Sequence, residues 1–323
     1  MQRIAAFPSL IENYLAETEF PDQPARLYQP IVYSLEEGGK RLRPMFVMLA
    51  CHLFSDEAER ALPAAAALEV FHNFTLLHDD IMDNAPLRRG RPSVYRKWNR
   101  NVAILSGDAM MIHAYRLLGR VPEEKLPEIL HCFNEVAIRV CEGQQYDMDF
   151  ESAERVSIDE YLRMIELKTS ALFVGSVLIG AMIGGADAQA LHHLDRFARE
   201  FGLAFQLQDD LLDSYGDSRL GKTVGGDILE GKKTFLMIRA LELASESDRR
   251  MLRTVPRERS LSSAEKIAAV LGIYDRYGVK ELTEREINLH FDRALAELDS
   301  LKEDPARVAP LKQFAQGLLG RTK

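Results

Sequence analysis

Apolar residues recur every three or four positions along most of the chain, which is the spacing of an amphipathic helix. The runs with this spacing are residues 42–54, 61–83, 103–121, 126–150 and 194–217. No stretch alternates between apolar and polar residues with a sustained period of two, so no convincing strand is predicted. The hydrophobic pattern therefore predicts an all-α fold.

Helix boundaries are marked by residues that commonly begin or end helices. These are Pro63, Pro127, Ser157 as an N-cap, and Gly184 with Gly185 as a stop signal. The segments without helical pattern are short, chiefly residues 84–92 and 216–233. No short repeat is visible and no Pro-rich or Ser-rich linker interrupts the chain, so one helical domain is predicted over residues 1–323.

Two of the apolar helical runs end in the same acidic pattern, Asp-Asp-x-x-Asp. The first is LLHDDIMD, which ends at Asp83, and the second is FQLQDDLLD, which ends at Asp213. Residues four apart share a helix face about 6 Å apart along the axis, so Asp79 projects with Asp83 and Asp209 with Asp213. A solvated acidic face would explain one such pair, but the apolar flanks argue against it. Two carboxylate clusters that face each other across a wet cavity favour hard cations, above all Mg²⁺.

Basic residues cluster in three segments close to these motifs. They are Lys40, Arg41 and Arg43 in GGKRLRP, Arg88, Arg89 and Arg91 after the first motif, and Lys222, Lys232 and Lys233 after the second. A loop that directly follows a helix starts at the end of that helix, so these cations and the carboxylates share one end. Arg binds phosphate oxygens in a bidentate manner, and Lys supplies a point charge. A solvated patch would explain any one cluster alone, whereas the three together predict a diphosphate site.

Composition narrows the class of protein further. The 323 residues are 46% hydrophobic and 28% charged, which excludes a disordered chain. The net charge of -8 argues against a binder of nucleic acid or of anionic membranes. The apolar run 171–185 is short and glycine-rich, so a packed central helix is expected rather than a membrane span. The acidic, amphipathic start predicts no signal peptide, and three cysteines without metal-ligand spacing suggest reduced thiols in a cytosolic compartment.

The motifs together resemble the trans-isoprenyl diphosphate synthases, or polyprenyl synthetases. The likeness runs through GGKRLRP, LLHDDIMDNAPLRRGRP, GDAMM, ELKTSALF, FQLQDDLLDSYGD and GKTVGGDILEGKKTF, in the order of the family. The resemblance implies an all-α isoprenoid-synthase fold around a deep central cavity, usually as a homodimer. It also implies head-to-tail condensation of isopentenyl diphosphate with an allylic diphosphate (dimethylallyl, geranyl or farnesyl), using three Mg²⁺ ions.

The resemblance also implies roles for individual residues. Asp79, Asp83 and Asp209 match the direct Mg²⁺ ligands, with Asp80, Asp210 and Asp213 near them or bound through water. Arg88 matches the residue that grips the allylic diphosphate, and Arg89, Lys40, Arg43 and His72 match the isopentenyl diphosphate site. Lys168, Thr169 and Gln206, with Lys222 and Lys232, match the groups around the allylic diphosphate and the developing cation. Taken alone, His72 on its apolar helix would more often be a satisfied core residue.

Product length depends on the side chain that blocks the growing tail. In the family the fifth residue before the first Asp commonly forms this floor, and here it is Phe74, which suggests a C15 or C20 product. Thr75 is small where farnesyl-type enzymes tend to carry an aromatic residue, which slightly favours C20. Ideal helix geometry puts Phe74 about 140° from Asp79, whereas Thr75 and Phe71 lie nearer the carboxylate face, so Phe71 is a rival floor. Ordinary core packing would also explain either Phe.

Two other functions compete with this interpretation. A terpene cyclase on the same fold would usually replace the second Asp-rich motif with an Asn/Asp, Ser, Glu pattern, and here that motif is intact. A catalytically silent subunit that modulates a partner synthase would be expected to lose a motif Asp or Arg, and none is missing. The C-terminal segment, which ends in Arg321 and Lys323, is expected to fold over the mouth of the site as part of a lid.

Overall fold

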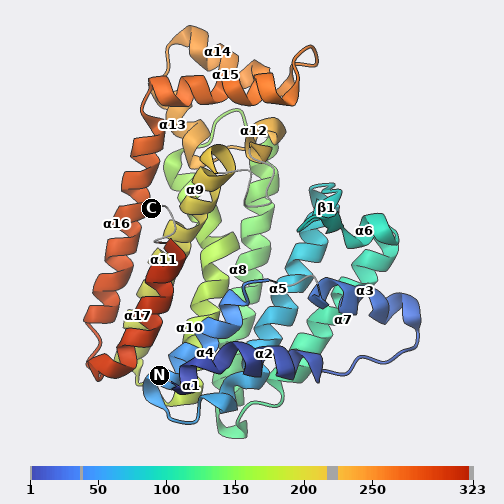
Figure 1. Ribbon diagram of the computed structural model, residues 1–323, viewed down its shortest axis with the longest axis vertical. Coiled ribbons are helices and arrows are strands. Elements are labelled where there is room, and N and C mark those ends of the chain that lie inside the picture. Colours follow the sequence, from blue (N-terminus) through green and yellow to red (C-terminus); the bar gives the residue numbers. More distant parts are fainter. Residues whose placement is uncertain (1, 37–38, 217–224, 320–323) are drawn as a thin grey trace. The chain divides into compact units, whose positions relative to one another are not determined.

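A computed structural model describes residues 2–36, 39–216 and 225–319 of the chain (Figure 1). Contacts divide the chain into two compact units. Unit 1 comprises residues 1–136, 172–195 and 301–314, and unit 2 comprises residues 137–171, 196–300 and 315–323. The expectation of one domain over the whole chain stays a prediction.

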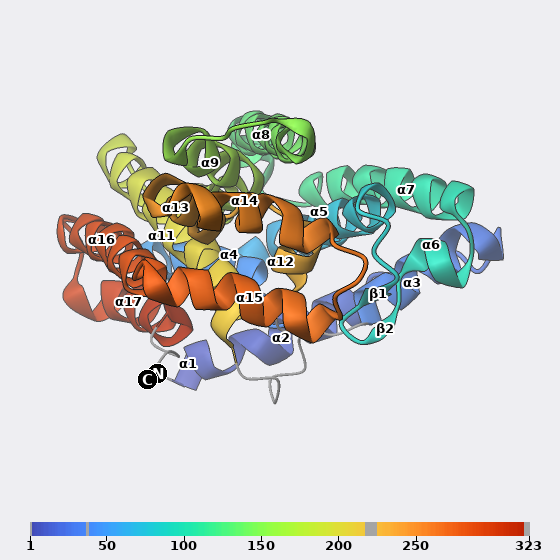
Figure 2. The ribbon, with the colours of Figure 1, turned by 90° about the horizontal axis from the view of Figure 1, so that it is seen from above.

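The first half of the chain builds most of unit 1. Its elements are α1 (Gln2–Ala5), α2 (Phe7–Ala16), α3 (Ala25–Glu36), α4 (Leu42–Phe54), η1 (Ala58–Ala61), α5 (Leu62–Met82), β1 (Leu87–Arg88), β2 (Arg91–Pro92), α6 (Val94–Lys97), α7 (Arg100–Leu118) and η2 (Glu123–Lys125). Helix α5 packs along α7 and against α4, as Figures 1 and 2 show. Its run of buried alanines, residues 64–67, permits this close packing.

Four helices contain residues of both units. They are α8 (Leu126–Ser152), α10 (Ala171–Gly184), α11 (Ala188–Tyr215) and α17 (Pro305–Leu319). Within unit 1, a Cβ added to Gly180 of α10 would lie 2.2 Å from the carbonyl oxygen of Val47 in α4. Only glycine permits this approach, so α10 and α4 pack with their backbones nearly in contact.

Unit 2 contains the remaining elements. They are α9 (Ile158–Ile165), the π-helical segment η3 (Glu166–Ser170), α12 (Gly226–Glu230), α13 (Phe235–Leu243), α14 (Glu246–Thr254), η5 (Val255–Arg257), α15 (Ser263–Arg276) and α16 (Val279–Asp299). Figure 2 shows α15 running alongside α13 and α14. Helix α16 packs against α13 and α15, and its buried His290 contacts Glu200 of α11 at 2.6 Å.

The predicted helices and their boundary signals are confirmed. The five helical runs correspond to α4, α5, α7, α8 and α11, and the all-α fold class is correct. Ser157 forms a capping box with Glu160, and α10 ends at Gly184 before Gly185 takes a φ of 95°. The prediction of no strand was wrong in one detail, because the loop after the first acidic motif pairs Arg88 with Arg91 in a two-residue antiparallel ladder.

Most of the apolar run 171–185 is part of a helical stretch that is longer than the sequence suggested and that includes the π-helical segment η3. Residues Ile158–Gly184 form 27 helical residues, long and apolar enough to span a membrane by length and composition. The protein itself buries 72% of the most apolar window, which is what a core helix requires. Core helices pass the same length and composition test, and this one is covered by its neighbours.

Candidate active site

The first acidic motif lies at the C-terminal end of α5. Asp79 is half-buried in the last turn, and Asp83 is the C-cap residue of the helix. Asp80 is 3% exposed and accepts hydrogen bonds from Arg88, at 2.9 Å from Nε and 2.5 Å from Nη2. The same Nη2 lies 3.4 Å from Asp79. The structure therefore pairs Arg88, which was expected to grip a diphosphate, with two carboxylates of the motif.

Burial and charge act in opposite directions on this pair. Burial raises the pKa of Asp80, the charge of Asp79 raises it further, and the hydrogen bonds from Arg88 oppose both. Burial lowers the pKa of Arg88, but hydrogen bonding and charge from Asp80 and Asp79 outweigh that effect and raise it. Each group therefore stabilises the charged form of the other.

The two arginines at the start of α4 differ in their partners. Arg41 is held by carboxylates, whereas Arg43 has a side-chain nitrogen that an anion could bind. Arg41 has a φ of 43°, and its guanidinium is held by Glu12 at 2.9 Å and by the buried Glu69 at 2.8 Å. Arg43 lies with its guanidinium 5.0 Å from the centre of the Phe173 ring. Its Nε is buried and has no hydrogen-bond partner among the described residues. Burial lowers the pKa of Arg43 to about 10, so it remains a cation that an anion would stabilise.

His72 lies among several arginines of unit 1. Burial lowers its pKa well below 6.5, and the charges of Arg43, Arg89, Arg88 and Arg41 lower it further. The positive charge of these arginines would attract an anionic ligand. The guanidinium of Arg89 lies beside Gly39, where an added Cβ would be 3.3 Å from its Nη1. Lys40 is exposed in the same segment.

The candidate floor residues lie on α5 one to two turns before the carboxylates. Phe71 is 1% exposed and packs edge-on against Phe133, with ring centres 5.1 Å apart. Phe74 is half-buried and contacts Phe71 at 5.5 Å and His78 at 4.8 Å. Thr75 donates from its hydroxyl to the carbonyl of His72 at 2.8 Å. Phe71 thus belongs to the core of unit 1, and Phe74 is the less enclosed ring.

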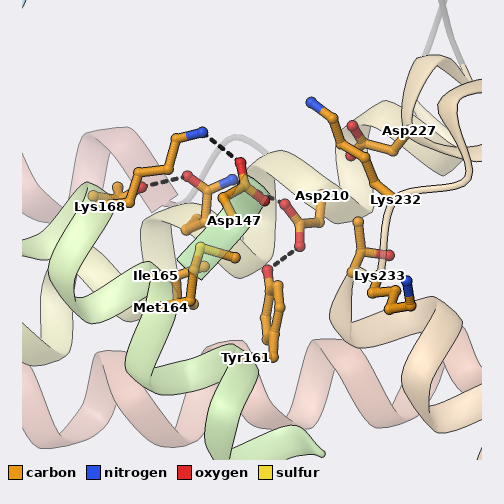
Figure 3. A pocket seen from close by; sticks show the side chains of 12 residues that line it. Asp147, Tyr161, Met164, Ile165, Lys168, Asp210, Asp227, Lys232 and Lys233 are labelled. Atoms are coloured by element: carbon orange, nitrogen blue, oxygen red, sulfur yellow. Dashed lines mark hydrogen bonds and ion pairs between the residues drawn. The ribbon is translucent and has the colours of Figure 1, made fainter. Parts of the chain in front are cut away.

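The second acidic motif lies on α11 in unit 2, beside a cavity of about 110 Å³ (Figure 3). Asp210 is buried at its wall and accepts hydrogen bonds from the hydroxyl of Tyr161 and, at 2.9 Å, from Gln206. Burial raises the pKa of Asp210 well above its ordinary value, and the charge of Asp227 adds to this. Asp209 is half-buried on the same helix.

The last Asp of this motif supports the segment that follows it. The carboxylate of Asp213 accepts the backbone N–H of Asp227 at 3.0 Å, near the start of α12. Burial raises the pKa of Asp227 to about 7, the charge of Asp213 raises it too, and Lys232 opposes them. Lys232 lies 3.2 Å from Glu230 and lines the cavity. Lys222 lies outside the described residues.

Lys168 and Thr169 enter the cavity from the π-helical segment η3. Nζ of Lys168 lies 2.5 Å from a carboxylate oxygen of Asp147 on α8. The hydroxyl of Thr169 donates to the side-chain oxygen of Gln206 on α11 at 2.8 Å. Gln206 donates in turn to Asp210, which also accepts from Tyr161, as Figure 3 shows for the Asp210–Tyr161 pair. Thr169, Gln206, Asp210 and Tyr161 therefore form one hydrogen-bonded chain along the cavity wall, and the Lys168–Asp147 pair lines the same cavity.

Three polar residues of this cavity were missed by the sequence reasoning, namely Asp147, Tyr161 and Asp227, whereas Lys233 belongs to the predicted basic cluster. Asp147 had a usable signal, because GQQYD is a polar interruption in the middle of an apolar helical run. Tyr161 had none, since a tyrosine on the apolar face of a short amphipathic helix predicts only core packing. Lys233 donates to the carbonyl of Phe150 and so ties the loop after α12 to α8.

The carboxylates of the two acidic motifs suit a cation that is also coordinated by a bound ligand such as a phosphate. Among residues 2–36, 39–216 and 225–319, no group of three or more His, Cys, Asp or Glu side chains is arranged to hold a metal by itself. Carboxylates without sulfur or imidazole suit Mg²⁺, which commonly binds through one or two of them together with phosphates and water.

Helices that carry carboxylates near basic side chains are suited to bind a diphosphate together with a divalent cation. The fold and the site therefore define a class of helical, diphosphate-binding proteins. Comparison with known proteins identifies the family. The polyprenyl synthetase family model matches residues 24–273. A geranylgeranyl diphosphate synthase of Methanosarcina mazei is 41% identical over 230 residues, covering 70% of this chain and 71% of that protein. The chain belongs to the polyprenyl synthetase family and is a prenyltransferase.

Two further comparisons cover nearly the whole chain. A geranylfarnesyl diphosphate synthase of Natronomonas pharaonis is 35% identical, with 97% of this chain and 95% of that protein covered. A crystal structure of a geranylgeranyl pyrophosphate synthase superposes with a TM-score of 0.93 at 39% identity, covering 99% of both chains. The resemblance inferred from the sequence motifs is confirmed, as is the all-helical fold.

Proposed function

We propose that this protein condenses isopentenyl diphosphate head to tail with an allylic diphosphate, giving a short-chain all-trans prenyl diphosphate. The observation that carries the proposal is the set of polar side chains, Lys168, Thr169 and Gln206, on the wall of the cavity beside the second acidic motif. The cavity of about 110 Å³ has room for a few water-sized groups, so it suits a polar head group rather than a whole C20 chain. The names of the relatives support the same reaction.

The proposed metal ligands are Asp79, Asp83 and Asp209, with three Mg²⁺ ions expected. Their carboxylate oxygens fit this ion, and Asp79 and Asp209 are half-buried. When bound, Mg²⁺ supplies charge that stabilises the oxygens of the leaving diphosphate.

Two anion sites are proposed for the two substrates. Arg43, His72, Arg89 and Lys40 form the isopentenyl diphosphate site in unit 1, and the buried Nε of Arg43 is a donor that a phosphate oxygen would satisfy. Lys168, Lys232 and Lys222 hold the allylic diphosphate, together with Arg88. For Arg88 to bind phosphate it must share or release Asp80, with which it pairs in this structure.

The residues around the cavity then assist three bond changes. The allylic C–O bond breaks and its electron pair leaves with the diphosphate, while dipoles of Thr169 and Gln206 stabilise the allyl cation. Apolar walls, including Met164 and Ile165, exclude water that would quench the cation to an alcohol. The double bond of isopentenyl diphosphate attacks the cation, and the departed diphosphate accepts the proton that is lost.

The product is proposed to be geranylgeranyl diphosphate, C20, slightly in preference to farnesyl diphosphate, C15. Phe74 is proposed as the floor because it is the less enclosed of the two phenylalanines, and Thr75 is small. One relative is named for a geranylgeranyl product and another for a geranylfarnesyl product, so relatives of similar identity differ in chain length.

A homodimer in the cytoplasm is proposed. Helix α7 leaves several apolar side chains exposed, namely Ile104, Leu105, Ile112 and Tyr115. Leu105 is 59% and Ile112 is 62% exposed, and seven residues separate them, so they share one face of the helix. Such an apolar face suits a second copy of the chain. No disulfide joins Cys51, Cys132 or Cys141 among the described residues, which is typical of a reducing compartment.

One experiment tests the proposal against its rivals. The purified protein is incubated with Mg²⁺, isopentenyl diphosphate and each of the C5, C10 and C15 allylic diphosphates, and product lengths are measured by mass spectrometry. Elongated diphosphates are expected. A cyclic hydrocarbon formed from the allylic substrate alone would favour the terpene cyclase, and no consumption at any Mg²⁺ concentration would favour the silent subunit.

A further inference from the structure

The π-helical segment η3 interrupts the long helix Ile158–Gly184 at the residues that face the cavity. A π turn is less favourable than continued α-helix, and such turns are found mostly at functional sites. Its geometry must therefore be maintained by neighbouring structure. Two helices of unit 2 contact the segment from outside, and both do so with the same arrangement of residues.

Helix α8 contacts the segment through Gly143 and Asp147. A Cβ added to Gly143 would lie 2.3 Å from the backbone nitrogen of Lys168 and 2.7 Å from its Cα. Because these are backbone atoms, no flexible side chain could move aside. One helical turn later, Asp147 lies 2.5 Å from Nζ of the same lysine. The helix thus touches the backbone of Lys168 with a glycine and holds its side chain with a carboxylate.

Helix α11 repeats this arrangement through Gly202 and Gln206. A Cβ added to Gly202 would lie 2.5 Å from Cα of Ser170 and 2.4 Å from its hydroxyl oxygen. One turn later, Gln206 accepts the hydrogen bond of Thr169 at 2.8 Å. The hydroxyl of Ser170 is buried without a hydrogen-bond partner among the described residues, so close packing holds this end of the segment.

We propose that Gly143 and Gly202 are positioning residues for prenyl transfer. Each glycine lets its helix approach η3 so closely that the polar residue four positions later, on the same helix face, orients Lys168 or Thr169 toward the cavity. Neither glycine touches substrate in this proposal. The inference rests on the proposed function, because it assigns the purpose of the π turn to the allylic half of that site.

The test substitutes each glycine by alanine. Gly143→Ala and Gly202→Ala are expected to lower kcat by about 100-fold, the size of effect that a displacement near 1 Å produces. KM for the allylic diphosphate is expected to rise, whereas KM for isopentenyl diphosphate stays unchanged because Arg43 and His72 are untouched. Hydrogen–deuterium exchange is expected to become faster in peptides covering residues 164–172.

Two control substitutions separate positioning from general destabilisation. Gly180→Ala introduces an equally severe contact, 2.2 Å from the carbonyl oxygen of Val47, nearly three turns beyond the π segment. It is expected to lower the unfolding temperature without raising KM for the allylic substrate. Gly272→Ala on α15 meets no atom within 4 Å and is expected to behave as wild type.

A volume-neutral variant covers the case in which the alanine variants do not fold. Asp147→Asn keeps the shape of its side chain but weakens its hold on Lys168, and the same selective rise in allylic KM is expected. The proposal is overturned if the wild type is active and the glycine variants match Gly180→Ala in both KM ratio and exchange. A wild type that consumes neither substrate would refute the proposed function instead, and the exchange measurement would still decide whether the glycines hold the segment.

Discussion

The guanidinium of Arg88 holds the carboxylate of Asp80 through two nitrogens, Nε at 2.9 Å and Nη2 at 2.5 Å. Asp80 is the second of the three aspartates in the first acidic motif and is 3% exposed. Removal of a buried carboxylate from such a pair leaves its partner unsatisfied and lowers the free energy of unfolding. Asp80 is therefore expected to stabilise the fold. The motif therefore combines two proposed metal ligands with one carboxylate that anchors the loop following α5.

Asp80→Ala should lower the free energy of unfolding by about 1–3 kcal/mol, because Arg88 would lose its buried partner. Urea denaturation followed by circular dichroism measures this change. Asp108→Ala is the matched control, since its side chain is 57% exposed and its contact with His78 is long, at 3.9 Å. Equal losses in the two variants would show that the Arg88 pair contributes nothing special.

Asp79→Asn and Asp209→Asn should each reduce turnover by about 10²–10³ or more, since an electrostatic contact at the leaving diphosphate is lost. The fold should survive, because neither side chain is fully buried. Steady-state rates over a range of Mg²⁺ concentrations and a thermal melt provide the two measurements. Chelation of Mg²⁺ should abolish wild-type turnover reversibly. Near-normal rates in both variants would remove these residues from the metal site.

Phe74→Ala and Phe71→Ala should have different consequences. Phe74→Ala should lengthen the product, because it removes the proposed floor while leaving the core ring in place. Phe71→Ala should cost about 3–5 kcal/mol of stability, since its ring is 1% exposed and packs against Phe133. Product analysis and urea denaturation of both variants distinguish the roles. Lengthening by Phe71→Ala alone would make Phe71 the floor.

The neutral state of His72 should make stability depend on acidity. Its folded pKa lies well below 6.5, so as pH falls through 6.5 the unfolded chain takes up a proton that the folded protein does not. This contribution is present above pH 6.5 and is lost below it, by up to about 1.4 kcal/mol per pH unit. His72→Gln should flatten the difference in unfolding free energy between about pH 5 and about pH 7.5. An unchanged difference would mean that other groups control it.

Ile112→Lys should convert the proposed homodimer to a monomer, because a charge would be placed in the apolar face of α7. Size-exclusion chromatography with light scattering measures the mass. Leu289→Lys on α16 is the control, as Leu289 is also an exposed apolar residue, at 43%. If the wild type is already monomeric, the exposed face of α7 needs another explanation.

The sequence alone determined the helical architecture and the chemistry of the site. Apolar spacing located α4, α5, α7, α8 and α11, because burial of one helix face imposes a period that any single chain must display. The two Asp-rich motifs and their basic flanks indicated the family. Charge on an apolar helix is costly unless it is paired or binds a ligand, so its presence points to a site.

Only the tertiary structure decided which charged groups are partners. Arg41 and Arg43 look equivalent in sequence, yet Glu12 and Glu69 occupy the first and leave the second with a buried, unpartnered nitrogen among the described residues. The π turn at Lys168 depends on Gly143 and Gly202, which are distant in sequence from it and from each other. Local patterns record what a segment prefers, whereas contacts between distant segments arise from packing, which no local pattern encodes.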